Sequence, residues 1–347
     1  MLRIVFFAAI AFAAPAFAQP FAPDATPAPS PEMPPAQVLA QFHHDEVNLL
    51  ALRGDAHSLL AAALMAQADA GDPARPKVLQ TPALLARAQK AADADALVWW
   101  ASAALECRGK AKACPNEQTL AQLEKADPGN AAAWLLALAR AQQAGDAATA
   151  RAALTSAAQA MRFDDNFGAL VALLYNAAGI LPVDERILRA SDQPGVNPSG
   201  FKLTYVAGIA VALPHPYLNA LTLACKDTAT DASLAADCVA VAQKMADGGS
   251  LFARDFGLRL LLQLVPDGAV HDANLARART AAWRMQRIGE LGARLADDSR
   301  VTGIYTQTLA ASGRESDAVD AVLHSQGVPL EPPADWQPPT TEPAAQP

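Results

Sequence analysis

The sequence has no excess of basic side chains. It contains 27 Lys and Arg residues against 35 Asp and Glu residues, for a formal net charge of −8. Nucleic-acid-binding proteins concentrate Lys and Arg on one face, so this balance argues against a nucleic-acid partner. After the N-terminal segment no apolar run reaches the roughly 20 residues of a membrane-spanning helix. The longest run, residues 203–213, contains Gly208 and ends at Pro214. We therefore expect no integral membrane segment in the mature chain.

Sequence signatures of several enzyme classes are also absent. The chain has no G-x-S-x-G motif, no glycine-rich phosphate loop and no C-x-x-C pair. Metal-capable side chains cluster from His43 to Glu46, but a helix would turn His44 away from the other two by about 100°. No spaced partner such as H-E-x-x-H follows. We therefore predict that the chain is not an enzyme and holds no cofactor and no metal.

The first 18 residues have the pattern of a secretory signal peptide. Arg3 provides a short basic region, residues 4–14 are apolar, and Pro15 precedes the small residues Ala16 and Ala18 of a cleavage site. Cleavage after Ala18 leaves 347 − 18 = 329 residues, and because Arg3 is the only charge removed, the net charge becomes −9. We expect a periplasmic protein that leaves the cytoplasm by the general secretory route.

The four cysteines form two pairs that are close in sequence, Cys107 with Cys114 and Cys225 with Cys238. In an exported protein disulfides are the expected state, and pairing by proximity is one of three possible connectivities. Neither pair has the short gap of a zinc site, and no His pair accompanies them. Closing two such loops restricts the unfolded chain by roughly 2.5 to 3 kcal/mol each in the chain-entropy model.

Proline is concentrated in two segments. Residues 19–37 contain seven prolines, and residues 328–347 contain seven again. Proline has no amide donor and a fixed φ, so such segments join neither helices nor sheets. We predict a Pro-rich linker at residues 19–37 and a Pro-rich disordered tail at residues 328–347.

Between these arms the sequence predicts an all-α fold. Gly54, Gly71 and Gly145 each precede an aspartate, as in a tight turn between two helices. Further predicted helix N-caps are Asp95, Asn116, Asn130 and Ser250. The helices are expected near residues 38–53, 56–70, 82–92, 96–108, 116–126, 131–144, 147–161, 167–178, 200–213, 216–226, 232–246, 251–264, 270–295, 300–311 and 315–325. A break at residues 191–199 is expected to divide a helical-repeat region, 38–190, from a C-terminal helical region, 200–327.

Two tryptophans indicate a repeat. Trp100 and Trp134 stand 34 residues apart, each early in an Ala/Leu-rich helical run, with a turn at Gly145 and a closely packing Ala150 in the later unit. Residues 97–166 therefore resemble two tetratricopeptide repeats, although Asn116 stands where the earlier unit usually has a small residue. A Sel-like variant of the same hairpin is an alternative for residues 50–110. Either resemblance implies an α-solenoid of antiparallel helical hairpins that binds a peptide or protein in its concave groove.

In that solenoid the groove is lined by the first helix of each unit. Carried over to this sequence, the groove positions are Val98, Ala101, Leu105, Arg108, Ala132, Leu135, Ala139, Gln142 and Gln143. This surface lacks the Lys/Arg clamp with which some family members hold a peptide carboxylate. The alternative is that these residues pack against another helix of the same chain.

The most basic stretch is the helix expected at residues 270–295. It contains Arg277, Arg279, Arg284 and Arg287, with apolar residues at spacings of three and four on another face. This pattern is typical of a core-packed helix with a solvated face. The alternative is contact with anionic lipid or with an acidic partner.

We interpret the chain as an exported, non-enzymatic helical-repeat protein that binds a protein or peptide in the bacterial cell envelope. Two alternatives remain open at this point. One is a periplasmic enzyme or ligand carrier with a site between the two helical regions. The other is a structural solenoid with no groove ligand.

Overall fold

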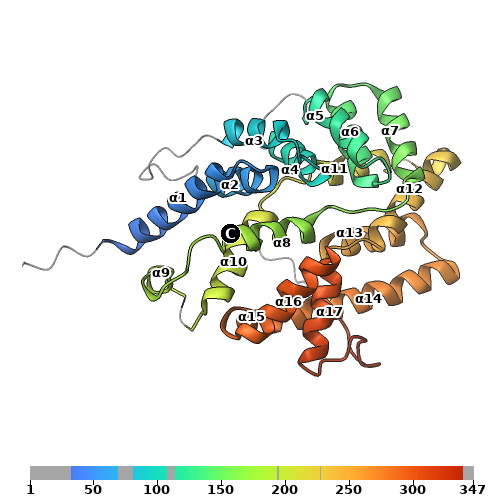
Figure 1. Cartoon of the computed structure of the whole chain (residues 1–347). Coiled ribbons are helices and arrows are strands. Elements are labelled where there is room, and N and C mark those ends of the chain that lie inside the picture. The colour runs from blue at the N-terminus through green and yellow to red at the C-terminus, as the bar shows by residue number, and fades with distance from the viewer. Residues whose placement is uncertain (1–32, 69–80, 108–113, 194, 227, 339–347) are drawn as a thin grey trace, which may run out of the picture. The chain divides into compact units, whose positions relative to one another are not determined.

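The chain is helical throughout the part that the structure describes. The structure is a computed structural model, and it describes residues 33–68, 81–107, 114–193, 195–226 and 228–338. Within these ranges it has seventeen α-helices, one short 3₁₀ helix and no strand, so the all-α prediction is confirmed (Figure 1). The expected signal peptide, most of the Pro-rich linker, the Gly71 turn and residues 339–347 lie outside the described residues.

The helices follow one another with short connections. They are α1 (Pro35–Arg53), α2 (Ala56–Ala68), α3 (Thr81–Lys90), α4 (Ala96–Glu106), α5 (Glu117–Ala126), α6 (Ala131–Gln143), α7 (Ala147–Gln159), α8 (Phe167–Ala177), α9 (Glu185–Ala190), α10 (Pro198–Val211), α11 (Pro216–Ala224), η1 (Thr228–Thr230), α12 (Ala232–Ala246), α13 (Leu251–Leu264), α14 (Gly268–Glu290), α15 (Gly292–Asp297), α16 (Ser299–Ser312) and α17 (Glu315–Ser325). The sequence did not predict α9, which has only six residues, and it merged α14 and α15 into one helix.

Local capping explains why the helices begin and end where they do. The side chains of all four predicted N-cap residues accept a hydrogen bond from a backbone N–H in the first turn, and these residues are Asp95, Asn116, Asn130 and Ser250. Gly54 and Gly145 have φ values of 81° and 72°. This left-handed conformation is the one that a helix-ending glycine adopts at little cost.

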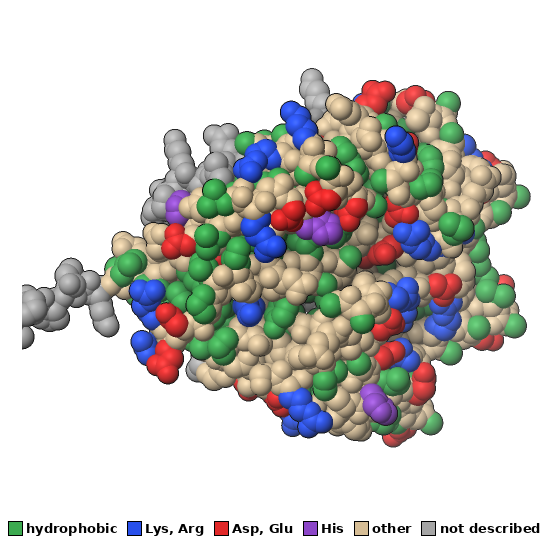
Figure 2. Space-filling model, in the orientation of Figure 1, with side chains coloured by type: hydrophobic (Ala, Val, Ile, Leu, Met, Phe, Trp, Pro, Cys, Tyr) green, Lys and Arg blue, Asp and Glu red, His purple; other side chains and the backbone are tan. Residues whose placement is uncertain are grey.

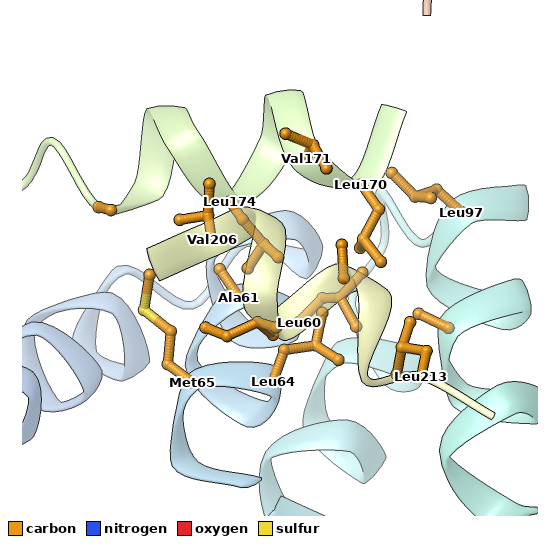
Figure 3. Packing of buried hydrophobic residues seen from close by; sticks show 14 of the residues in the cluster. Leu60, Ala61, Leu64, Met65, Leu97, Leu170, Val171, Leu174, Val206 and Leu213 are labelled. Carbon is orange, nitrogen blue, oxygen red and sulfur yellow. The ribbon is translucent and has the colours of Figure 1, made fainter. Parts of the chain in front are cut away.

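The largest hydrophobic core surrounds α2. Leu60 and Leu64 of this helix are 0% and 1% exposed, and side chains from α4, α8 and α10 pack around them (Figure 3). The same cluster includes Val319 of α17, so helices from before and after residues 191–199 share one core. That segment is therefore a local break, with Gly195 at φ 80°, and it does not separate two hydrophobic cores.

A second core forms around α6. This helix packs against its hairpin partner α7 and also against α11, where the side-chain amide of Gln142 donates to the carbonyl oxygen of Ala220 at 2.9 Å. In a simple solenoid each hairpin contacts only its neighbours in sequence. Here α6 with α11, α7 with α12 and α8 with α16 are packed pairs, so helices far apart in the sequence are interleaved.

One contact does follow the 34-residue period of the sequence. Asn130 and Asp164 lie one period apart, and the Asn130 side chain both donates to the Asp164 carbonyl oxygen at 2.9 Å and accepts from the Asp164 N–H at 2.9 Å. Arg162 also forms an ion pair with Asp127 at 2.8 Å. The loops that close the two successive hairpins therefore touch.

The described part of the C-terminal tail corrects a prediction. Residues 328–338, expected to be disordered, lie along α14 and are held by its side chains. Their prolines keep them out of any helix, as expected, but Trp283 and Arg284 supply the donors that their carbonyl groups need.

Both predicted disulfides are present. Cys107 is bonded to Cys114 and Cys225 to Cys238, with Cα–Cα distances of 5.0 and 5.8 Å. They indicate an oxidising, exported environment.

On the face that Figure 2 shows, acidic and basic side chains are interspersed among apolar and uncharged ones. No single helix among the described residues is long and apolar enough to cross a membrane. One pair, α10 and α11, meets the length and composition criteria together but is bent by 42°.

Candidate functional site

The predicted groove residues are mostly inside the protein. Of the eight described positions, six are buried, namely Val98, Ala101, Leu105, Ala132, Leu135 and Ala139. Gln142 is half-buried and Gln143 is exposed, and Arg108 lies outside the described residues. The alternative prediction, that these residues meet other helices of the same chain, therefore describes this arrangement. They would have to be uncovered before they could bind a partner.

The two tryptophans of the repeat have different surroundings. Trp100 is 3% exposed, and its ring lies 5.8 Å from the ring of Tyr217 in α11. Trp134 is partly buried, and its indole N–H donates to the carbonyl oxygen of Pro128 at 2.9 Å. Both rings belong to the second core, but only Trp100 is joined to the C-terminal helices through an aromatic pair.

A cleft of about 570 Å³ lies between the two helical regions that the sequence distinguishes. Its walls are apolar and come from α8, α10, α13 and α14; they include Phe167, Val211, Leu251, Phe252, Met285 and Ile288. Its polar groups include Asp165, Ser250 and Glu315, which all lie at helix N-termini. The cleft is thus largely hydrophobic, with polar atoms at a few defined points.

These polar groups meet at the N-terminus of α13. The Ser250 hydroxyl accepts a hydrogen bond from the Ala253 N–H at 3.0 Å and donates to the Asp165 carboxylate at 2.5 Å. Glu315, from the start of α17, accepts from the Leu251 N–H at 2.8 Å. Two carboxyl groups from distant segments therefore approach one helix N-terminus, where unpaired N–H groups favour negative charge.

Burial makes both carboxyl groups weaker acids than usual. Asp165 is 5% exposed, and its burial raises the pKa from 3.8 to about 6, although the Ser250 hydroxyl and the Phe167 N–H oppose this shift. Burial likewise raises the pKa of Glu315 from 4.5 to about 7. The negative charge of Asp165 adds to this shift, whereas the Leu251 N–H and the positive charge of Arg254 oppose it. Perturbed carboxyl groups in a cleft are characteristic of functional sites, although structural networks also produce them.

His215 also lines the cleft, and it contacts the buried Tyr217. Burial lowers the pKa of His215, which favours the neutral imidazole. Its Nδ1 lies 3.1 Å from the hydroxyl of Tyr217, and its ring lies 5.6 Å from that of Phe252. Burial and the charge of Asp165 raise the pKa of Tyr217 well above 10, so this residue stays a neutral phenol. Tyr217 contacts both His215 of the cleft and, with ring centres 5.8 Å apart, Trp100 of the second core.

The His43 cluster forms an ordinary buried contact. The His43 Nδ1 lies 3.2 Å from the Glu46 carboxylate one turn along α1, and its ring stacks on Tyr205 at 4.1 Å. Across the residues that the structure describes there is no group of three or more His, Cys, Asp or Glu side chains that could hold a metal ion.

Comparisons with known proteins leave the cleft as the main guide to function. No family model, curated protein or solved structure matches this chain.

No distinctive sequence signal marks the cleft. Ser250 is predicted only as a helix cap, and Asp165 is one of the last residues of the segment that resembles two repeats, 97–166. Glu315 is the first residue of its helix, a position where an acidic residue is common. Their role depends on burial and on contacts between residues up to 85 positions apart, and neither can be read from spacing.

Proposed function

We propose that this chain is a non-enzymatic binding protein of the bacterial cell envelope and that its ligand occupies the cleft at the N-terminus of α13. The ligand that fits is an amphipathic group, apolar along most of its length and carrying an amine at one end. A peptide or protein partner can supply such a group as a side chain or a chain terminus. The observation that carries the proposal is the pair of carboxyl groups, the buried Asp165 and the half-buried Glu315, in an otherwise apolar cleft.

The apolar walls define most of the ligand. Ligand pockets in proteins typically measure roughly 300–1,000 Å³ and are lined by hydrophobic side chains with a few polar groups that fix orientation. The cleft has a volume of about 570 Å³ and is walled by Phe167, Phe252 and Ile288, among others. Phe252 is 49% exposed, which leaves a large aromatic surface for a ligand to cover. A phenyl or branched aliphatic group would bury its surface against these walls.

The two carboxyl groups define the polar end. Among the described residues neither Asp165 nor Glu315 forms an ion pair with a Lys, Arg or His side chain, whereas Asp255 at the same cleft pairs with Arg259. A bound ammonium group would provide the missing positive charge and would favour the ionised carboxylates. Binding would therefore release protons at a pH between the free and bound pKa values.

The proposed location of the mature protein is outside the cytoplasm. The two disulfides fit an oxidising compartment, and the first 18 residues have the composition of a cleavable signal. We place the mature protein in the periplasm on this basis.

Titration calorimetry with a small amine tests the ligand chemistry. The probe is 2-phenylethylamine, and the matched control is 3-phenylpropionate, which has a similar apolar part but the opposite charge. At about pH 6.5 we expect the amine to bind with release of protons, seen as a dependence of the heat on the buffer's ionisation enthalpy. The anion should not bind, because the cleft already holds two acidic groups.

Two variants locate the binding. Asp165→Asn and Glu315→Gln should each weaken amine binding about tenfold, which is the typical effect of losing one charged hydrogen bond. Asp272→Asn, at an exposed position on α14, removes the same charge outside the cleft and should leave binding unchanged. Equal binding of the anion, or equal weakening by the control variant, would show that the cleft does not select an amine.

A further inference from the structure

The C-terminal segment of the described chain lies against α14. We call residues 328–337 the strap. The Trp283 indole N–H donates to the Pro329 carbonyl oxygen at 2.8 Å, and the Arg284 Nε donates to that of Leu330 at 3.1 Å. Trp336 packs edge-on against Trp283, with ring centres 5.4 Å apart.

Arg279 holds the far end of the strap. Its guanidinium donates to the carbonyl oxygen of Trp336 at 2.7 and 3.0 Å and to that of Ala334 at 3.0 Å, and it also contacts the Pro333 carbonyl oxygen. The same guanidinium lies 5.8 Å from the ring centre of Trp336. Backbone carbonyl groups thus receive most of the contacts.

This face of α14 recognises an extended, proline-rich chain. Most carbonyl acceptors of such a chain are not paired within the segment, and it has few N–H donors. The strap makes one such bond of its own, from the Trp336 N–H to the Pro333 carbonyl oxygen at 3.1 Å in a turn. The side chains of Arg279, Trp283 and Arg284 present only donors and an aromatic surface, which match those acceptors. The strap lies on the protein surface, where Glu331, Pro333 and Ala334 are exposed. Hydrogen bonds and one aromatic pair hold it, and its residues Val328 and Leu330 are partly buried against the edge of the largest core.

A cavity of about 480 Å³ lies beside the strap, between α13 and α14. Arg254, Arg277 and Arg284 line it, and Glu331 reaches it from the strap. Glu331 accepts from the Thr280 hydroxyl at 2.7 Å and pairs with Arg284 at 3.4 Å.

One arginine of the cavity has no ion pair among the described residues. Arg277 pairs with Asp247 at 2.5 Å, and Arg284 pairs with Asp320 at 3.0 Å as well as with Glu331. The Arg254 guanidinium donates to the carbonyl oxygen of Gly248 at 2.7 Å, and Asp317 and Asp320 act on it only from beyond ion-pair distance. A further carboxylate in the cavity would therefore have Arg254 as its partner.

We propose that the α14 face formed by Arg279, Thr280, Trp283 and Arg284 is a docking site for an extended, proline-rich and acidic segment of a partner protein. The strap is an internal ligand that occupies this site until such a segment displaces it. A partner with a second carboxylate would reach the cavity and Arg254, which gives it an advantage over the strap. This site is separate from the amine-binding role proposed for the cleft, and either can fail without the other.

A partner segment must compete with the strap, which belongs to the same chain as the site on α14. A short flexible connection gives a bound segment an effective concentration on the order of millimolar. A free peptide with the strap's own sequence should therefore bind wild-type protein poorly and should bind well only after the strap has been weakened.

The test uses full-length protein carrying Glu331→Gln and Trp336→Ala, which weaken the strap and leave α14 intact. The probe is a fluorescein-labelled peptide with the sequence of residues 328–338, and fluorescence anisotropy measures binding. We expect at least tenfold tighter binding to this double variant than to wild type. If the double variant does not fold, as judged by circular dichroism, the single variant Trp336→Ala replaces it.

Two comparisons make the result specific. Adding Arg279→Ala to the strap variant should abolish peptide binding, whereas adding Arg300→Ala, at an exposed arginine on α16, should not. A peptide with Gln and Asn in place of Glu331 and Asp335 should bind several-fold more weakly. The proposal is overturned if the strap variant does not bind the peptide, if it binds no better than wild type, or if Arg279→Ala has no effect.

Discussion

The buried carboxyl group of Asp165 should make the protein less stable at neutral pH than at mildly acidic pH. Its pKa is about 6 in the folded protein, compared with 3.8 for an exposed aspartate. The folded state therefore keeps its proton to higher pH than the unfolded state does. The contribution to stability is fully present below about pH 4 and is lost as the pH rises through about 6.

The size of this effect follows from the shift. Raising the pKa from 3.8 to about 6, at roughly 1.4 kcal/mol per pKa unit, gives a total on the order of 3 kcal/mol, most of which falls between about pH 4 and pH 7. Asp165 is 5% exposed, so solvent screening reduces the value little. Glu315 acts in the same direction, but it is only half-buried and contributes less than its shift alone would indicate.

Asp165→Asn isolates the contribution. The amide oxygen can still accept from the Phe167 N–H, and the amide nitrogen can donate to the Ser250 hydroxyl, so the shape of the site is kept while the titration is removed. Urea unfolding of both proteins at a series of pH values gives their difference in unfolding free energy. We expect this difference to move in favour of the variant by about 2 to 3 kcal/mol between about pH 4 and pH 7.

The difference in unfolding free energy between Asp165→Asn and wild type can refute the raised pKa of Asp165. Because it is a difference between two proteins, every other titrating group cancels unless it is coupled to Asp165. A difference that stays constant with pH, or that moves in favour of wild type, would refute the assignment of a raised pKa to Asp165. Asp272→Asn, at an exposed site, should give a constant difference and serves as the control.

Three further predictions concern stability and are read from chemical or thermal unfolding. A Cβ at Gly200 would overlap the Ala296 carbonyl oxygen in α15, so Gly200→Ala should destabilise the protein by several kcal/mol; Gly208→Ala in the same helix meets no atom within 4 Å and should stabilise it by up to about 1 kcal/mol. Replacing Cys225 and Cys238 by alanine should cost about 3 kcal/mol, and the reducing agent dithiothreitol should then have no further effect on this loop. Tyr217→Phe should cost about 1 kcal/mol by removing the contact with a buried imidazole, and a change below about 0.3 kcal/mol would show that the contact contributes little.

Helix positions were predictable because their signals are local. The capping side chains of Asp95, Asn116 and Asn130 and the left-handed glycines act within a few residues of the helix ends, so the sequence contains the whole interaction. The short helix α9 was missed because six residues give too little periodicity to detect.

The arrangement of the helices was less predictable because alanine-rich faces do not specify a partner. A face such as Ala132, Leu135 and Ala139 on α6 fits an open groove or a covering helix equally well in sequence terms. In the structure all three are buried, and α11, from nearly 80 residues away, packs against this helix. Only a tertiary contact decides between the two.

The strap is a second case in which a tertiary contact, absent from the sequence pattern, decides the structure. Proline composition correctly excludes helix and sheet from residues 328–338, and disorder is the ordinary consequence for a segment that cannot pair its backbone. Here Arg279, Trp283 and Arg284 pair it instead. The pattern of this helix predicts a solvated basic face, but Arg279 and Arg284 bind carbonyl groups of the strap, and Arg287 pairs with Glu290.

The energetic cost at the α13 N-terminus is itself an argument for a ligand. Asn in place of Asp165 and Gln in place of Glu315 could make the same backbone contacts without a charge to bury, so carboxyl groups are not needed for capping alone. At neutral pH Asp165 is ionised and Glu315 is partly ionised, which reduces stability, and no described cation forms an ion pair with either group. An ammonium group in the cleft would remove that cost and would therefore stabilise the protein by more than its apolar contacts alone provide. Stabilisation by 2-phenylethylamine should accordingly be larger at about pH 7 than at about pH 4, and it should lose this pH dependence in Asp165→Asn combined with Glu315→Gln.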